Sequence, residues 1–264
     1  MSVGDAVERL QRAQASVQPC PPVRDLLVAA DLDAEVDLAY DVQQAIVAAR
    51  VAAGARVVGR KIGLTNPKVR AQLGVDRPDF GVLLDDMQAT QDEPIDAGRL
   101  LAPRIEAEIA FVLGADLDRP DVSTADVRDA TAYVRTAFEI VDSRIAGWDI
   151  TISDTIADNG SSAMFVLGDA EVPLDGLDLA AASMTMTRHG EVVSEGLGSD
   201  CLGDPVAAVA WLAENARRYG QPLRAGEIVL SGALGPVVPV VAGDAFTARI
   251  EGLGDVRASF AGTS

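Results

Sequence analysis

The clearest alternation of apolar and polar residues in this sequence lies at residues 103–113. Apolar side chains recur there at every second position: Ile105, Ala107, Ile109, Phe111 and Leu113. A period of two is typical of a β-strand, so Glu106 and Glu108 project together from the opposite face, about 7 Å apart. Ala110 and Val112 continue that face as apolar residues. The pattern therefore predicts a strand whose glutamate face becomes buried.

A second predicted strand, 137–144, also carries a carboxylate, because Glu139 lies between Phe138 and Ile140. Buried carboxylates lose hydration and repel one another unless a cation, a proton or arginine compensates. Three carboxylates suit Mg²⁺ or Mn²⁺, whereas Zn²⁺ prefers imidazole or thiolate, and the chain has one histidine. Glu106, Glu108 and Glu139 are therefore candidate ligands of a divalent metal. A structural calcium site is the alternative.

The remaining pattern predicts helices in the amino-terminal part of the chain and mostly strands after it. We expect residues 1–55 to form a helical layer, with helices at 4–15 and 35–53, on a β-rich catalytic core of 56–264 within a single domain, 1–264. Other elements are predicted from strand patterns, caps and turns. They are strands at 56–62, 227–230, 237–241 and 245–250, helices from 65 or 66 to near 74, from 123 to about 136 and from 205 to 220, and a hairpin centred on His189-Gly190.

Three polar groups lie at positions that suit a ligand, but each also has an ordinary structural explanation. Lys61 ends a predicted strand beside a glycine, although most lysines are simply exposed. The loop 74–81 contains Asp76 and Asp79, and the polar cluster 154–162 precedes an apolar run. Loops of this composition carry catalytic groups or are plain solvated turns.

Composition and charge narrow the class of protein. Of the 264 residues, 48% are hydrophobic and 23% charged, as in an ordinary soluble globular protein, and the net charge is −18. Without a basic patch, nucleic acid and anionic membranes are excluded as partners, and an acidic ligand needs local cations. Cys20 and Cys201 are far apart, which suggests inert thiols in a reducing compartment. The amino terminus lacks the apolar core of a secretion signal, so we expect a cytoplasmic protein.

Five stretches together resemble the 2-keto-4-pentenoate hydratase family of the fumarylacetoacetase-like superfamily, nearly from end to end of the chain. They are 57–65 (Val-Val-Gly-Arg-Lys-Ile-Gly-Leu-Thr), 73–81 (Leu-Gly-Val-Asp-Arg-Pro-Asp-Phe-Gly), 103–108 (Pro-Arg-Ile-Glu-Ala-Glu), 154–159 (Asp-Thr-Ile-Ala-Asp-Asn) and 230–235 (Leu-Ser-Gly-Ala-Leu-Gly). The resemblance implies an α+β fold, a distorted β-roll of mixed sheets with helices outside.

The resemblance also implies roles for particular residues. Three glutamates of the family hold a divalent metal and match Glu106, Glu108 and Glu139. Its proton-transferring lysine and aspartate match Lys61 and Asp79. Its site serine matches either Ser161 or Ser162, because Gly160 stands where alanine is more usual.

The reaction implied by the resemblance is the metal-dependent hydration of 2-hydroxypenta-2,4-dienoate to 4-hydroxy-2-oxopentanoate. A 2-oxo acid offers a carboxylate and an adjacent oxygen to Mg²⁺ or Mn²⁺, which stabilises an enolate. Lys61 and Asp79 would move the protons, and Lys61 could also pair with the substrate carboxylate. Family members form homo-oligomers and act in aromatic meta-cleavage pathways beside a decarboxylase or an aldolase. We therefore expect a homo-oligomer here, with either a decarboxylase or an aldolase as a partner enzyme in the pathway.

Three other functions compete with hydration. A decarboxylase acting on 2-oxo-hexenedioate shares nearly all these motifs, but needs a cation for its second carboxylate. A C–C hydrolase of the superfamily typically uses a histidine–glutamate pair, and the single histidine, His189, lies at a predicted hairpin tip. An acidic binding protein with a structural cation would bind metal without turnover.

Overall fold

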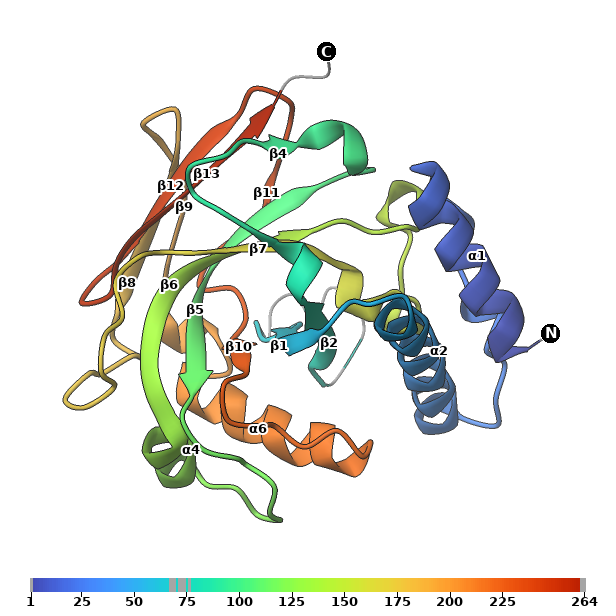
Figure 1. The fold of residues 1–264 in the computed structure, drawn as a ribbon, viewed down its shortest axis with the longest axis horizontal. Helices are drawn as coiled ribbons and strands as arrows, with labels where there is room; N and C mark the ends of the chain where they lie inside the picture. The colour runs from blue at the N-terminus through green and yellow to red at the C-terminus, as the bar shows by residue number, and fades with distance from the viewer. Residues whose placement is uncertain (1, 67–69, 71–74, 76, 262–264) are drawn as a thin grey trace.

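Two curved β-sheets form the body of the protein, and the longer helices lie around the larger sheet (Figure 1). The computed structural model describes residues 2–66, 70, 75 and 77–261. The predicted helix from 65 or 66 to near 74 lies mostly outside the described residues. Both helices and strands are present, as the predicted α+β class requires.

The larger sheet contains the two strands that carry Glu106, Glu108 and Glu139, and its order is β2-β1-β10-β5-β6-β7-β3, with β11 paired to β5. Its longest strands, β5 and β6, are adjacent and antiparallel, and they curve through the middle of the molecule (Figure 1). The strands span these residues: β1 Val57–Gly63, β2 Asp79–Leu84, β3 Gln88–Ala89, β5 Arg104–Leu113, β6 Thr131–Val141, β7 Ser162–Leu167, β10 Ile228–Leu230 and β11 Val238–Pro239.

The smaller sheet has the order β4-β13-β12-β8-β9 and packs through β13 on β6. Its strands are β4 Ile95–Asp96, β8 Ser183–Arg188, β9 Glu191–Leu197, β12 Ala245–Ile250 and β13 Gly254–Ala261. The predicted hairpin at His189-Gly190 is confirmed, because these two residues join β8 to β9 with positive φ angles of 51° and 86°.

The amino-terminal helices lie side by side at one end of the larger sheet (Figure 1). The helices and short helical turns are α1 Val3–Ser16, η1 Arg24–Leu26, α2 Leu32–Ala52, η2 Asp85–Met87, η3 Ala97–Arg99, α4 Thr124–Ala130, η4 Ala146–Trp148, α5 Ile152–Ala157, η5 Asn159–Ser161, η6 Gly198–Asp200 and α6 Pro205–Arg218. Asp204 caps α6 as predicted, since its Oδ1 accepts from the amide of Val206 at 2.9 Å. Within the described residues no helix is long and apolar enough to cross a membrane.

Two predicted elements differ from the structure. The helix expected at 123–136 ends at Ala130, because the β-branched and aromatic residues that follow extend β6 along β5. The cluster 154–162 is neither a solvated turn nor an open loop, but a buried helix, α5, followed by η5. Asp154 of α5 accepts backbone hydrogen bonds from Val23 and Arg24, at 2.8 and 2.9 Å. Remote partners therefore allow this polar segment to be buried.

Candidate active site and metal centre

Strand register brings the three glutamates to one place. Glu106 of β5 lies directly opposite Glu139 of β6, and directly paired residues share a face of a sheet. Glu108 is two positions along β5 and so lies on that face too. One carboxylate oxygen from each residue lies within 4.8 Å of the other two. The period-two pattern thus correctly predicted that Glu106 and Glu108 share a strand face, and the pairing of β5 with β6 brings Glu139 to the same face.

Lys61 reaches the same cluster from β1. It pairs with Leu230 of β10, which pairs with Ala110 of β5, so all three lie on the glutamate face. Its Nζ lies 3.2 Å from Glu139 Oε1, and the two side chains are 3% and 1% exposed. The interpretation of Lys61 as an ordinary exposed lysine is therefore wrong.

Asp79 is the first residue of β2 and is buried, so it does not lie in a loop as expected from the sequence. It pairs with Gly63, which shares a face with Lys61. A Cβ at Gly63 would lie 2.0 Å from Asp79 Oδ1. Glycine at this position therefore lets the carboxyl group approach β1 and the lysine.

The two candidate serines occupy different sides of the site. Ser162 begins β7 and faces Glu139, whose pKa its hydroxyl helps to lower, and its Oγ has no hydrogen-bond partner among the described residues. Ser161 has a positive φ of 52°, and its Oγ lies 3.4 Å from the hydroxyl of Thr155, next to Asp79. The structure thus brings both serines to the edge of the cluster.

Gly160 precedes them with a φ of +64°. A Cβ there would lie 2.5 Å from Lys61 Cε. The departure from alanine noted in the sequence therefore leaves the lysine side chain room to lie against η5.

Burial and mutual repulsion dominate the electrostatics of the cluster. Desolvation, and then Glu139, raise the pKa of Glu106 to about 7. Desolvation also raises the pKa of Glu108 and of Glu139, although Lys61 opposes the shift at Glu139. Burial alone would lower the pKa of Lys61, but Glu139 and Asp79 outweigh it, so this pKa lies above its ordinary value and the ammonium stays charged.

The donor set fits a divalent cation. Glu108 Oε1 and Glu139 Oε2 are buried and have no hydrogen-bond partner among the described residues, although buried polar atoms are normally paired. Neither sulfur nor imidazole joins the set: His189 lies on the other sheet, and the thiol of Cys201 donates to the carbonyl of Ser231. Three carboxylates without nitrogen or sulfur ligands favour a hard cation.

Sequence reasoning missed three groups around the site. The amide of Gly232 donates to Glu108 Oε2 at 2.8 Å and fixes that carboxylate. Thr155 lies between Asp79 and Ser161, and Arg104 lies two positions before Glu106 on the same strand face. All three belong to stretches singled out in the sequence, but their roles depend on contacts that no local pattern encodes.

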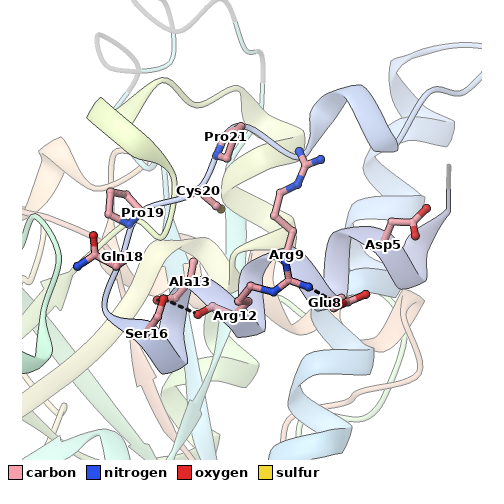
Figure 2. Close-up of a pocket in the computed structure, with 10 residues that line it drawn as sticks. All are labelled: Asp5, Glu8, Arg9, Arg12, Ala13, Ser16, Gln18, Pro19, Cys20 and Pro21. Atoms are coloured by element: carbon pink, nitrogen blue, oxygen red, sulfur yellow. Dashed lines mark hydrogen bonds and ion pairs between the residues drawn. The ribbon is translucent and has the colours of Figure 1, made fainter.

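The surface pockets of the protein do not by themselves identify the candidate active site. One pocket, with a volume of about 460 Å³, lies beside α1. Figure 2 shows the residues that line it, among which Arg12 pairs with Glu8. None of the candidate site residues lines it. A hollow of about 240 Å³ between α1 and α2 does reach Ser162. We therefore identify the candidate site from its cluster of buried charged residues and not from a pocket.

Comparison with known proteins agrees with this geometry. The family described as fumarylacetoacetate (FAA) hydrolase C-terminal matches residues 55–261. The chain is 52% identical over 252 residues to a 2-keto-4-pentenoate hydratase of Paraburkholderia phymatum, covering 96% of this chain and 95% of that protein. It is 43% identical to a 2-hydroxyhexa-2,4-dienoate hydratase of Comamonas testosteroni, covering 96% and 95%.

Among solved structures, the 4-oxalocrotonate decarboxylase of Pseudomonas putida G7, complexed with magnesium and adipate, has a TM-score of 0.92 and 34% identity, covering 98% of this chain and 97% of that one. A fumarylpyruvate hydrolase of Pseudomonas aeruginosa with Mn²⁺ and pyruvate, at 13% identity and a TM-score of 0.62, covers 77% and 89% and shares the fold. The chain therefore belongs to the 2-keto-4-pentenoate hydratase family of the fumarylacetoacetase-like superfamily.

Proposed function

We propose that the protein hydrates 2-hydroxypenta-2,4-dienoate to 4-hydroxy-2-oxopentanoate. The observation that carries the proposal is the buried glutamate cluster, which has unpaired oxygens beside Lys61 and Asp79. The chain has about 50% identity to hydratases over nearly its full length, which supports the same chemistry. A protein that only stored a structural cation would not need a buried lysine and a buried aspartate next to it.

Glu106, Glu108 and Glu139 would hold the divalent cation, for which we propose Mg²⁺ or Mn²⁺. When bound, the cation would supply Lewis-acid stabilisation of negative charge on the oxygen at C2. The solved 4-oxalocrotonate decarboxylase complexed with magnesium, 34% identical to this chain, supports a divalent ion of this kind.

Lys61 and Asp79 would move the protons. Desolvation raises the pKa of Asp79, so this buried carboxyl can carry a proton and deliver it to C5 of the dienoate. The charged ammonium of Lys61 would stabilise negative charge on the substrate during proton transfer. As C5 gains this proton, the hydroxyl group at C2 loses its own and becomes the keto group, and that proton restores Asp79. Water then adds across C3 and C4, its hydroxyl going to C4 and a proton to C3, so the overall change is the addition of one H₂O. Ser161 and Ser162 would position the water, since both hydroxyls lie at the edge of the cluster.

Decarboxylation is the second candidate, because the 4-oxalocrotonate decarboxylase matches the fold along nearly the whole chain. To separate the two, metal-stripped protein reloaded with Mg²⁺ is incubated with 2-hydroxypenta-2,4-dienoate or with 2-oxo-hexenedioate. NMR spectroscopy identifies the products. Hydration of the first acid supports our proposal. Release of carbon dioxide from the second, without hydration of the first, would replace it with decarboxylation.

The setting of the enzyme is also part of the proposal. We propose a homo-oligomer, for which exposed apolar residues such as Val192 and Val241, 56% and 62% exposed, offer contact surface. We further propose that it works in the cytoplasm on a small-molecule acid supplied or consumed by a decarboxylase or aldolase of aromatic meta-cleavage catabolism. Sedimentation of the purified protein tests the first of these statements.

A further inference from the structure

An acidic protein that binds an acidic substrate needs a local cation that is free to meet it. The net charge of −18 repels an anion at long range. Lys61 is not fully available to bind an anion, because its Nζ already pairs with Glu139 Oε1 at 3.2 Å. A cation without a carboxylate partner, on the sheet face that carries the glutamates, would be better placed to bind the carboxylate of a substrate.

Arg104 is such a cation. It begins β5 and shares a face with Glu106, two residues and about 7 Å away along the strand. The two charges influence one another, since each shifts the pKa of the other toward the charged form. Among the described residues, the guanidinium has neither a hydrogen bond nor an ion pair. Its donors are therefore available.

Arg104 lies at the open side of the cluster. Glu108 and Glu139 are 0% and 1% exposed, whereas Glu106 and Arg104 are half-buried. A ligand that approaches the glutamates from this side meets the arginine first. A half-buried guanidinium also binds a carboxylate more strongly than a fully solvated one, because less water competes with it.

Trp148 holds the arginine in place. The guanidinium carbon lies 4.2 Å from the centre of the indole ring, a stacked cation–π contact. The indole Nε1 donates to the carbonyl of Ala102 at 3.0 Å. Asp142 in turn accepts from the amides of Leu101 and Ala102, at 2.8 and 2.6 Å. The segment before β5 and the tryptophan are thus fastened together.

The backbone at Trp148 is strained, with a φ of +56° directly after Gly147 at +66°. A bulky residue rarely adopts this conformation, and such strain persists where surrounding contacts require it. Here it sets the indole over Arg104. The arrangement fixes the guanidinium before any ligand arrives, which reduces the entropy cost of binding.

We propose that Arg104, stacked on Trp148, binds the carboxylate of the 2-oxo acid substrate at the open side of the glutamate cluster. This inference rests on the proposed function for the identity of the acid. Its physical basis is separate: a free, oriented guanidinium two residues from a metal ligand. Arginine suits the role because its planar fork can donate two parallel hydrogen bonds to a carboxylate.

The test is calorimetric binding of 2-oxopentanoate, a saturated acid that cannot be hydrated, to Mg²⁺-loaded protein. We compare wild type with Arg104→Met, Arg104→Lys and the control Arg99→Met, which removes the same charge from an exposed turn. The Arg104→Met variant is expected to bind the acid about 10- to 100-fold more weakly, as for loss of a hydrogen-bonded charge pair. Arg104→Lys retains part of the affinity, and Arg99→Met stays within about twofold of wild type.

Mg²⁺ affinity is measured in parallel, because a structural role for Arg104 would disturb the glutamates as well. Removing a cation beside Glu106 leaves Mg²⁺ affinity equal or tighter if our inference holds. Acid binding within twofold of wild type in Arg104→Met, equal losses of acid and Mg²⁺ affinity, or wild-type protein that does not bind 2-oxopentanoate would each overturn it. Should Arg104→Met not fold, Trp148→Leu replaces it, with weaker acid binding expected. Failure of the proposed function would be seen separately, as absence of dienoate turnover by wild type.

Discussion

Replacing Lys61 with methionine tests the account of the buried charges most stringently. Methionine has a similar length and no charge, so the substitution removes the ammonium without opening a large cavity. The Lys61 Nζ and Glu139 Oε1 are 3.2 Å apart, and both side chains are almost fully buried. At an effective dielectric constant of about 20, that separation corresponds to about 5 kcal/mol of attraction.

The net effect is smaller, because the ammonium also loses hydration when it is buried. Breaking a buried pair typically costs about 3 to 5 kcal/mol, since the remaining carboxylates are left uncompensated. We expect a loss of this size in the free energy of unfolding of metal-free Lys61→Met at pH 8. A saturating divalent cation should recover part of it by replacing the lost positive charge.

Urea unfolding of metal-free protein at pH 8 and pH 5 measures both effects. At pH 5 the three glutamates, whose pKa values are all raised, carry more protons, so the loss caused by Lys61→Met should shrink. Arg60→Met is a matched control. Arg60 is buried and directly precedes Lys61 in β1, so its side chain projects from the opposite face of the strand. Its Nη1 lies 3.5 Å from Glu227 Oε1, so the variant removes a buried cation that does not contact the glutamate cluster.

Arg60→Met should also be destabilising, but its loss should not depend on added Mg²⁺. The reasoning would be refuted if Lys61→Met were destabilised equally at both pH values and gained no more from Mg²⁺ than the Arg60 variant. Such a result would mean that Lys61 does not compensate the glutamate cluster.

Three further predictions follow from the same geometry. Glu106→Gln should lower Mg²⁺ affinity at least about tenfold and reduce hydration in parallel, as measured by calorimetry and NMR, and unchanged affinity would remove Glu106 from the site. Between pH 4.5, the ordinary pKa of a glutamate, and about pH 7, Glu106 of the metal-free wild type binds more protons in the folded state than in the unfolded state. This group therefore makes the free energy of unfolding fall as the pH rises through that window. Mg²⁺ binding near pH 6.5 should release protons, which calorimetry in buffers of different ionisation enthalpy detects. Gly160→Ala should lower the free energy of unfolding more than Gly176→Ala, as measured by urea unfolding, because a Cβ at residue 160 would lie 2.5 Å from Lys61 Cε. Gly176 has a similar φ of +76° and no neighbouring atom within 4 Å, so its variant should lose only about 1 kcal/mol, and equal losses would contradict the close packing of Lys61 on Gly160.

Local periodicity was enough to predict the strand face that carries Glu106 and Glu108, because alternation along one strand encodes it. Local periodicity could not predict that Glu139 lies opposite Glu106, because the pairing register of two separate strands is not encoded in the pattern of either strand. The burial of Lys61 has the same origin. It depends on parallel pairing of β1 with β10, which lies more than 160 residues further along the chain.

The segment 154–162 shows why polar composition alone misleads. Its Asp154 is completely buried because amides of the segment 23–24, about 130 residues earlier, satisfy its carboxylate. Likewise Arg104 looked like part of a motif, and only the contact with Trp148 gives it a separate role. In each case a distant part of the chain decides whether a polar side chain is solvated or held in the site.

The central claim is that this glutamate cluster supports hydration only with a divalent cation. The most direct measurement adds Mg²⁺ in steps to metal-stripped protein with 2-hydroxypenta-2,4-dienoate and follows loss of the diene absorbance while NMR identifies the product. The account predicts negligible hydration without metal and saturable formation of 4-hydroxy-2-oxopentanoate as Mg²⁺ binds. Hydration at full rate in stripped protein, or Mg²⁺ binding with no conversion of the dienoate, would contradict it.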